Sequence, residues 1–109
     1  MRIFIVVPVE NRKLEEARHE ADLVKASLSR RGHTPVSPFD IYVGKGANKY
    51  DRAAAWMRAA LDCDCVFMCV GWGNSPTCCT IFNAVRNFSG VDGNKEYRVI
   101  YGRSKDKKS

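Results

Sequence analysis

Residues 64–77 constrain the fold of this 109-residue chain more than any other segment. They include an unbroken apolar run from Cys65 to Val70, which is typical of a strand covered on both faces of a sheet. Two glycines within the next three residues permit a tight turn. Ser75 and Pro76 then form a helix-start pair, because a hydroxyl caps a helix well and proline suits the first helical position. This order of strand, glycine-rich loop and helix predicts an α/β fold.

Three segments show apolar residues at helical spacing, and we predict helices over 12–31, 50–61 and 76–88. Asn11 is the expected cap of the first helix, and Gly32 is its expected end. The residues expected to face inward are Leu14, Ala17, Ala21, Val24 and Leu28 in the first helix, Tyr50, Ala54, Met57 and Leu61 in the second, and Ile81, Phe82 and Val85 in the third.

Strands are predicted over 2–8, 33–38, 65–70 and 97–101, and two prolines place 33–38 at an edge of the sheet. Strands that alternate with helices give a parallel sheet with right-handed crossovers. We therefore expect a flavodoxin-like three-layer sandwich with strand order 2-1-3-4 and helices on both faces. Residues 1–102 form this single domain, and 103–109 are expected to be a basic, disordered tail.

Ligands of such sheets bind beyond the carboxyl ends of the strands, at the crevice where the strand order reverses. Strands one and three flank that crevice in this chain. The helix that follows strand three contributes unpaired N–H groups and a positive dipole end, which suit a phosphate, a carboxylate or a polarised hydroxyl. The residues predicted to bind a ligand there are Pro8, Val9, Glu10, Gly71, Trp72, Gly73, Asn74, Ser75 and Thr77.

Composition restricts the partners that we expect. No run approaches the ~20 apolar residues that cross a membrane, so no membrane contact is predicted. The net charge of +6 is compatible with nucleic acid, but the sequence contains no DNA- or RNA-binding motif. We interpret the five cysteines, an odd number within 63–79, as reduced residues of a cytoplasmic protein. Their spacings are not those of zinc ligand pairs, so no metal or cofactor is expected.

The chain contains, in this order, Met1-Arg2-Ile3-Phe4-Ile5 before a proline, the segments 31–38 and 57–64, and Gly71-Trp72-x-x-Ser75. Together these segments resemble the nucleoside 2-deoxyribosyltransferase-like superfamily, and within it the small DUF4406-type proteins of phages and bacteria. The resemblance extends over almost the whole chain. It implies a flavodoxin-like domain, often oligomeric, with a nucleoside or nucleotide pocket at the strand ends.

The resemblance also implies that the catalytic carboxylates of the transferases are missing. Active members use a glutamate in an Asp-x-Gly-x-x-x-Glu pattern to attack the anomeric carbon of the sugar. Here the pattern corresponds to Ser75-x-Thr77-x-x-x-Ile81, and a second family carboxylate corresponds to Trp56. Val7 replaces a small residue and would crowd a ribose. Because glycosyl transfer needs a nucleophile and an acid–base partner, no transferase activity is expected.

Three functions remain open from the sequence. The chain is a nucleoside- or nucleotide-binding protein without transferase activity, or an interaction protein of a phage or its host that uses a basic surface. The third alternative is an N-glycosidic-bond enzyme with relocated catalytic residues, for which Glu10 and Cys78 are the candidates. Glu10 either binds a sugar hydroxyl or is a solvated loop residue. Cys78 is either a thiolate stabilised by the helix start or a small packing residue. Trp72 either stacks on a base or covers the core. A homo-oligomer joined through exposed apolar helix faces is also predicted.

Overall fold

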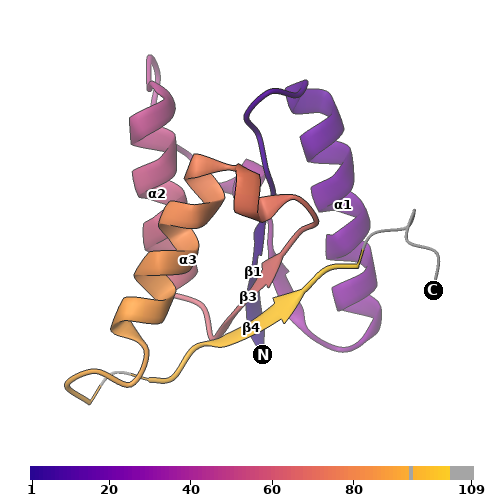
Figure 1. The fold of residues 1–109 in the computed structure, drawn as a ribbon. Coiled ribbons are helices and arrows are strands. Elements are labelled where there is room, and N and C mark those ends of the chain that lie inside the picture. Colours follow the sequence, from indigo (N-terminus) through magenta and orange to yellow (C-terminus); the bar gives the residue numbers. More distant parts are fainter. Residues whose placement is uncertain (94, 104–109) are drawn as a thin grey trace.

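The structure is a computed structural model that describes residues 1–93 and 95–103, and it contains one parallel sheet of four strands (Figure 1). The strands are β1 (Arg2–Val6), β2 (Thr34–Val36), β3 (Cys65–Met68) and β4 (Arg98–Tyr101). Their order is β2-β1-β3-β4, which confirms the predicted topology. Apart from Arg103, the predicted basic tail lies outside the described residues.

Helices cover both faces of the sheet, as the three-layer prediction requires. They are α1 (Leu14–Arg30), α2 (Lys49–Leu61) and α3 (Pro76–Phe88), with short 3₁₀ helices η1 (Pro38–Asp40) and η2 (Trp72–Asn74). Figure 1 shows α1 on one face and α2 beside α3 on the other. The two faces are therefore unequally covered, with one described helix against two.

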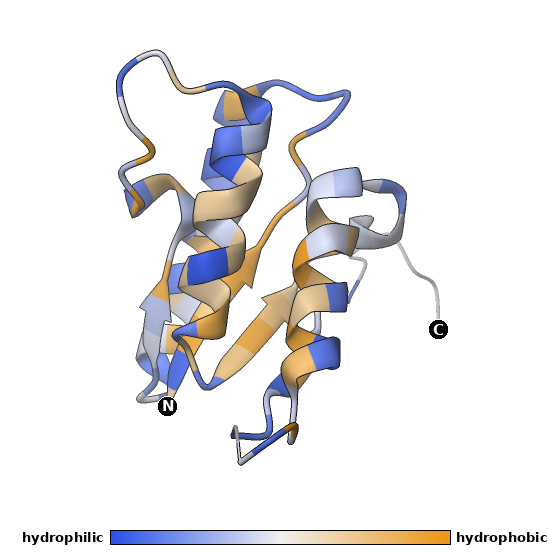
Figure 2. Ribbon diagram, turned by 90° about the vertical axis from the view of Figure 1, so that its left-hand side faces the viewer, coloured by the Kyte–Doolittle hydropathy of each residue, from blue (hydrophilic) through white to orange (hydrophobic). Residues whose placement is uncertain are grey.

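The core is built around the two central strands. Residues Ile3 to Val6 of β1 are fully buried, as are Val66 and Met68 of β3. Figure 2 shows hydrophobic strands behind helices that carry both hydrophilic and hydrophobic residues. None of the helices in the described part of the chain is long and apolar enough to cross a membrane.

The first helix begins later than predicted. Asn11 has a φ of 60°, so it makes a turn instead of capping a helix, and α1 starts at Leu14 after Lys13, which provides no side-chain cap. Leu14 is 51% exposed and does not face the core, whereas Ala17, Ala21 and Leu28 are buried as predicted. The turn at Asn11 was missed because an asparagine before a helical pattern is usually a cap.

The buried face of α2 also differs from the prediction. Met57 and Leu61 are partly buried and pack against the core, as predicted. Tyr50 is 71% exposed and Ala54 is exposed, whereas Trp56 and Ala60 are buried. Trp56 packs edge-on against Phe39 of η1, with ring centroids 5.7 Å apart. Burying this large aromatic side chain stabilises the fold more than burying an alanine, and it sets which side of α2 faces the sheet.

Candidate functional site

The carboxyl ends of β1 and β3 lie side by side, where the sequence predicts a crevice. Pairing continues past β3 through a hydrogen bond from the Cys69 N–H to the Val6 carbonyl, with N and O 2.9 Å apart. Gly71 has a φ of 88°, a conformation that favours glycine, and a Cβ atom built on it would lie 3.9 Å from Cγ of Pro8. Two predicted site residues from distant parts of the chain therefore meet here.

The start of α3 follows the predicted helix-start chemistry. Ser75 is the N-cap, its buried hydroxyl accepts a hydrogen bond from the Cys78 N–H at 3.2 Å, and Pro76 is the first helical residue. The helix ends at Phe88, as predicted. The N-terminus of α3 is thus fixed at the end of the sheet that carries the crevice.

Glu10 is bound directly to this helix start. The Ser75 hydroxyl donates a hydrogen bond to Oε1 of Glu10, and the Thr77 hydroxyl donates one to Oε2. The backbone N–H of Thr77 also donates to Oε2, at 3.1 Å. Glu10 is consequently held against α3 by three hydrogen bonds. The sequence leaves two roles open for Glu10, a ligand for a sugar hydroxyl and a solvated loop residue. These hydrogen bonds do not agree with the second role.

The hydrogen bonds also stabilise the ionised form of Glu10. Partial burial raises the pKa of its carboxyl, but the hydroxyls of Ser75 and Thr77, together with backbone N–H groups, outweigh burial and lower the pKa from 4.5 to about 2. The group is therefore ionised at neutral pH. Its negative charge lies at the positive end of the α3 dipole, the position where an external anion would otherwise bind.

Cys78 lies in the first turn of α3 but has the environment of a core residue. It is fully buried, and burial raises the pKa of its thiol to about 12 although the hydrogen bond from Ser75 acts in the opposite direction. A helix start by itself favours a thiolate, which is one of the two alternatives that the sequence leaves open for Cys78. In the structure the loss of solvent has the larger effect, so the thiol is neutral and serves packing.

The loop before α3 presents both packed and free groups. Trp72 is half-buried, and its indole ring packs on Phe82 and Tyr101, with ring centroids 4.7 Å and 6.1 Å away. Gly73 and Asn74 are exposed, and the side-chain amide of Asn74 makes no hydrogen bond to any other described residue. Trp72 thus has a clear packing role, whereas the Asn74 amide is free to contact a ligand.

The two positions that correspond to transferase carboxylates lie in the hydrophobic core. Ile81 is 1% exposed and Trp56 is 2% exposed. Asp64 accepts a hydrogen bond from the Arg2 backbone N–H at the amino end of β1, away from the crevice. Within 1–93 and 95–103, no group of three or more histidine, cysteine or acidic side chains could hold a metal ion.

Arg12 is a site neighbour that the sequence analysis did not single out. Its guanidinium donates to the Pro8 carbonyl at 3.4 Å and forms an ion pair with Glu20 at 2.7 Å. The contact depends on the turn at Asn11, which brings the chain back over the end of β1. A lone arginine in a polar stretch gives no sequence signal for such a contact.

Two hollows are found away from Glu10. A groove of about 1520 Å³ runs between α1 and the β3–β4 half of the sheet, and it approaches the crevice at Arg12 and Cys69. A smaller hollow of about 230 Å³ lies between Leu61 and Tyr97, at the opposite end of the sheet. Glu10 lines neither of these two hollows.

Comparison of the chain with protein-family models, curated proteins and solved structures finds no match. The resemblance to deoxyribosyltransferases therefore stays a prediction from the sequence.

Proposed function

We propose that this protein binds a nucleoside, in its uncharged, hydroxyl-bearing form, at the crevice between Glu10 and the loop 71–74, and that it does not transfer the sugar. The observation that carries the proposal is the ionised Glu10 carboxylate held at the N-terminus of α3. A fixed carboxylate at a strand end accepts hydrogen bonds from sugar hydroxyls. The exposed Asn74 amide offers donor and acceptor groups for the edge of a base.

The same carboxylate favours a nucleoside over a nucleotide. Glu10 already occupies the positive end of the α3 dipole, so this helix start is not free for a phosphate. A phosphate about 5 Å from the carboxylate would be repelled by about 3 kcal/mol per unit charge at an effective dielectric constant of about 20. This narrows the sequence prediction, which allowed both ligand classes.

Binding without transfer agrees with the composition of the site. The counterparts of the family's catalytic carboxylates are the core residues Ile81 and Trp56, and the Cys78 thiol is neutral and buried. Glu10 remains the carboxylate at the crevice, but its oxygens already accept hydrogen bonds from α3. A carboxylate engaged in this way is a poor nucleophile, so its expected role is recognition.

The test is isothermal titration calorimetry with adenosine, uridine, their 2′-deoxy forms and the corresponding 5′-monophosphates. We expect at least one nucleoside to bind about tenfold or more tightly than its monophosphate. Glu10→Gln should weaken nucleoside binding and reduce the discrimination against phosphate. Asp64→Asn removes the same charge at the opposite end of the sheet and should leave binding unchanged.

Absence of heat with every nucleoside would contradict the proposal, and so would equal effects of Glu10→Gln and Asp64→Asn. Incubation of the protein with deoxynucleosides, followed by chromatography, separates binding from catalysis. Release of free base by the wild type that is lost in Glu10→Gln would favour the alternative of an N-glycosidic-bond enzyme with relocated residues.

A further inference from the structure

The groove of about 1520 Å³ beside α1 is a surface feature that the crevice does not explain. One of its walls is α1, and its floor is the β3–β4 half of the sheet, where Phe67 and Ile100 are neighbours in the strand register. Leu23, Val70 and Tyr101 line it and are 49%, 43% and 55% exposed. Apolar groups of this size, grouped in one groove, are typical of an interaction surface.

The uneven coverage of the sheet indicates which kind of element fits the groove. Two helices, α2 and α3, pack on one face, whereas α1 alone covers the other face in the described chain (Figure 1). The space beside α1 lies over the strands that α1 leaves open. A second helix placed alongside α1 would complete this layer.

On the face of α1 that lines the groove, acidic residues precede Leu23 and basic residues follow it. Glu15 and Glu16 lie in the first half, and Arg30 and Arg31 lie in and just after the last turn. Glu16 precedes Leu23 by seven residues and Arg30 follows it by seven, while Glu15 and Arg31 are each eight residues away. All four are exposed, and within the described residues none of them forms an ion pair.

We propose that the groove binds the α1 helix of a second copy of this chain, antiparallel to its own, about a twofold axis that passes near Leu23. Such an axis brings Glu16 of each copy opposite Arg30 of the other, and Glu15 opposite Arg31, since an antiparallel pair matches residues equally distant from the axis. The two Leu23 side chains meet at the centre, where apolar burial provides most of the affinity.

The charge pattern favours a second copy over a nucleic acid. A groove that binds a phosphate backbone needs arginine and lysine throughout, whereas this one is lined by three glutamates and four arginines. The acidic and basic groups lie at opposite ends of one helix, which is the self-complementary arrangement that a twofold interface requires. The proposal is independent of nucleoside binding, because it uses neither Glu10 nor the loop 71–74.

The first test is sedimentation equilibrium of the full chain, which we expect to give a dimer mass at concentrations well above micromolar. Leu23→Lys should raise the dimer dissociation constant about tenfold or more, because two charges are buried at the centre. Leu14→Lys is the matched control, since Leu14 is exposed to the same degree on the same helix but lies outside the groove. It should leave the mass unchanged.

Charge reversal tests the register. A chain with Glu15→Lys and Glu16→Lys, and a chain with Arg30→Glu and Arg31→Glu, should each be monomeric, because like charges then face each other. An equimolar mixture of the two should form a heterodimer, since both contacts become attractive again. One chain carrying all four substitutions should regain the homodimer. Recovery of this kind cannot come from misfolding.

A wild type that stays monomeric overturns the proposal. If such a monomer binds a random oligonucleotide and loses it on Arg30→Glu, the groove is a nucleic-acid site instead. A dimer that Leu23→Lys and the charge reversals do not weaken would place the interface elsewhere on the molecule and would equally overturn the proposal.

Discussion

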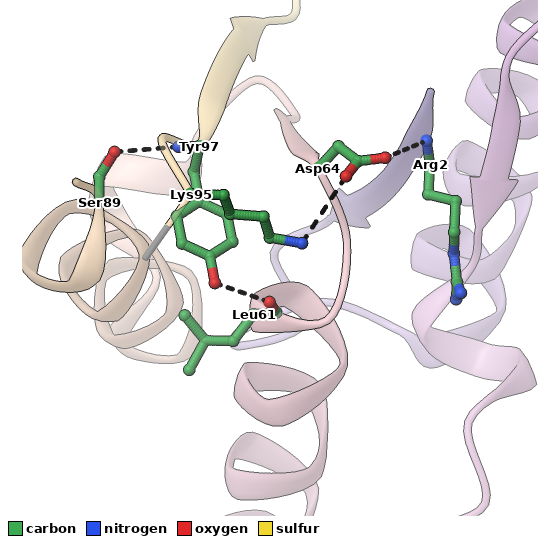
Figure 3. A network of polar contacts seen from close by, with 6 residues as sticks. All are labelled: Arg2, Leu61, Asp64, Ser89, Lys95 and Tyr97. Atoms are coloured by element: carbon green, nitrogen blue, oxygen red, sulfur yellow. Dashed lines mark hydrogen bonds and ion pairs between the residues drawn. The ribbon is translucent and has the colours of Figure 1, made fainter. Parts of the chain in front are cut away.

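At each end of the sheet, a carboxylate accepts a hydrogen bond from the backbone N–H of another element. The two carboxylates differ in their environment. At the carboxyl end Glu10 binds the Thr77 N–H and two hydroxyls. At the amino end, shown in Figure 3, Asp64 accepts a hydrogen bond from the Arg2 N–H at 3.0 Å and lies 3.7 Å from the Lys95 ammonium group. The first carboxylate is partly buried, whereas the second is exposed.

The difference shows how burial and donor number change the role of a carboxylate. The Arg2 N–H, and to a lesser extent Lys95, lower the pKa of Asp64, but water competes for every one of its partners. The better-protected contact at that end is the Tyr97 hydroxyl, which donates to the Leu61 carbonyl at 2.7 Å (Figure 3). Glu10 thus links the end of β1 to the start of α3 at the candidate site, whereas Asp64 links the start of β1 to the segment before β4.

The largest effect is expected for Glu10→Gln. The lowering of the pKa from 4.5 to about 2 corresponds to roughly 3 kcal/mol, and solvent screening of a partly open group reduces this to about 1–2 kcal/mol of the free energy of unfolding. Urea denaturation measures the change. An unchanged unfolding midpoint would show that Glu10 is a solvated loop residue.

The pH dependence follows from the direction of the same shift. Because the pKa of Glu10 is lower in the folded protein, its contribution to stability is fully present above pH 4.5 and is lost as the pH falls toward 2. The difference in melting temperature between wild type and Glu10→Gln should therefore shrink across this window. A difference that stays constant from pH 6 to about pH 2.5 would contradict the ionised state.

Tyr97→Phe should have the next largest effect, because it removes the hydrogen bond to the Leu61 carbonyl while keeping the ring. The expected loss is about 1 kcal/mol in the free energy of unfolding. Tyr42→Phe is the control, since Tyr42 is exposed and its hydroxyl makes no hydrogen bond within the described residues. Equal losses of unfolding free energy in the two variants would show that the Tyr97 hydroxyl does not stabilise the amino end of the sheet.

Asp64→Asn should have the smallest effect on thermal stability, because the asparagine amide oxygen can still accept the Arg2 N–H and the charge that is lost is exposed. The small change should vanish at high salt, where surface charges are screened. A loss as large as that of Glu10→Gln would contradict the contrast between the two ends.

The parts of the fold that depend on local chemistry were predictable from the sequence. The apolar run of β3 and the pair Ser75 and Pro76 specify a strand and a helix start by themselves, and the strand order follows from alternating elements. The burial of Trp56 on the inward face of α2 was not predictable in this way. It depends on Trp56 meeting Phe39, a tertiary contact that periodicity does not encode.

The sequence predicts where the candidate site lies but not which of its residues contact each other. Glu10 and Ser75 are both named by the sequence, yet they lie 65 residues apart and nothing local indicates that one binds the other. For Cys78, the local sequence does give a signal, but the folded environment overrides it. A helix start suggests a thiolate, but the complete burial that reverses this effect is visible only once the core is assembled.

The most direct test of the central claim is an NMR titration of the Glu10 side-chain carboxyl carbon between neutral pH and the acid limit of folding. The hydrogen bonds from Ser75 and Thr77 predict a pKa of about 2, with the group ionised throughout the neutral and mildly acidic range. A midpoint near 4.5, the value of an unperturbed glutamate, would mean that Glu10 does not occupy the start of α3, and the proposed preference for a nucleoside would lose its basis.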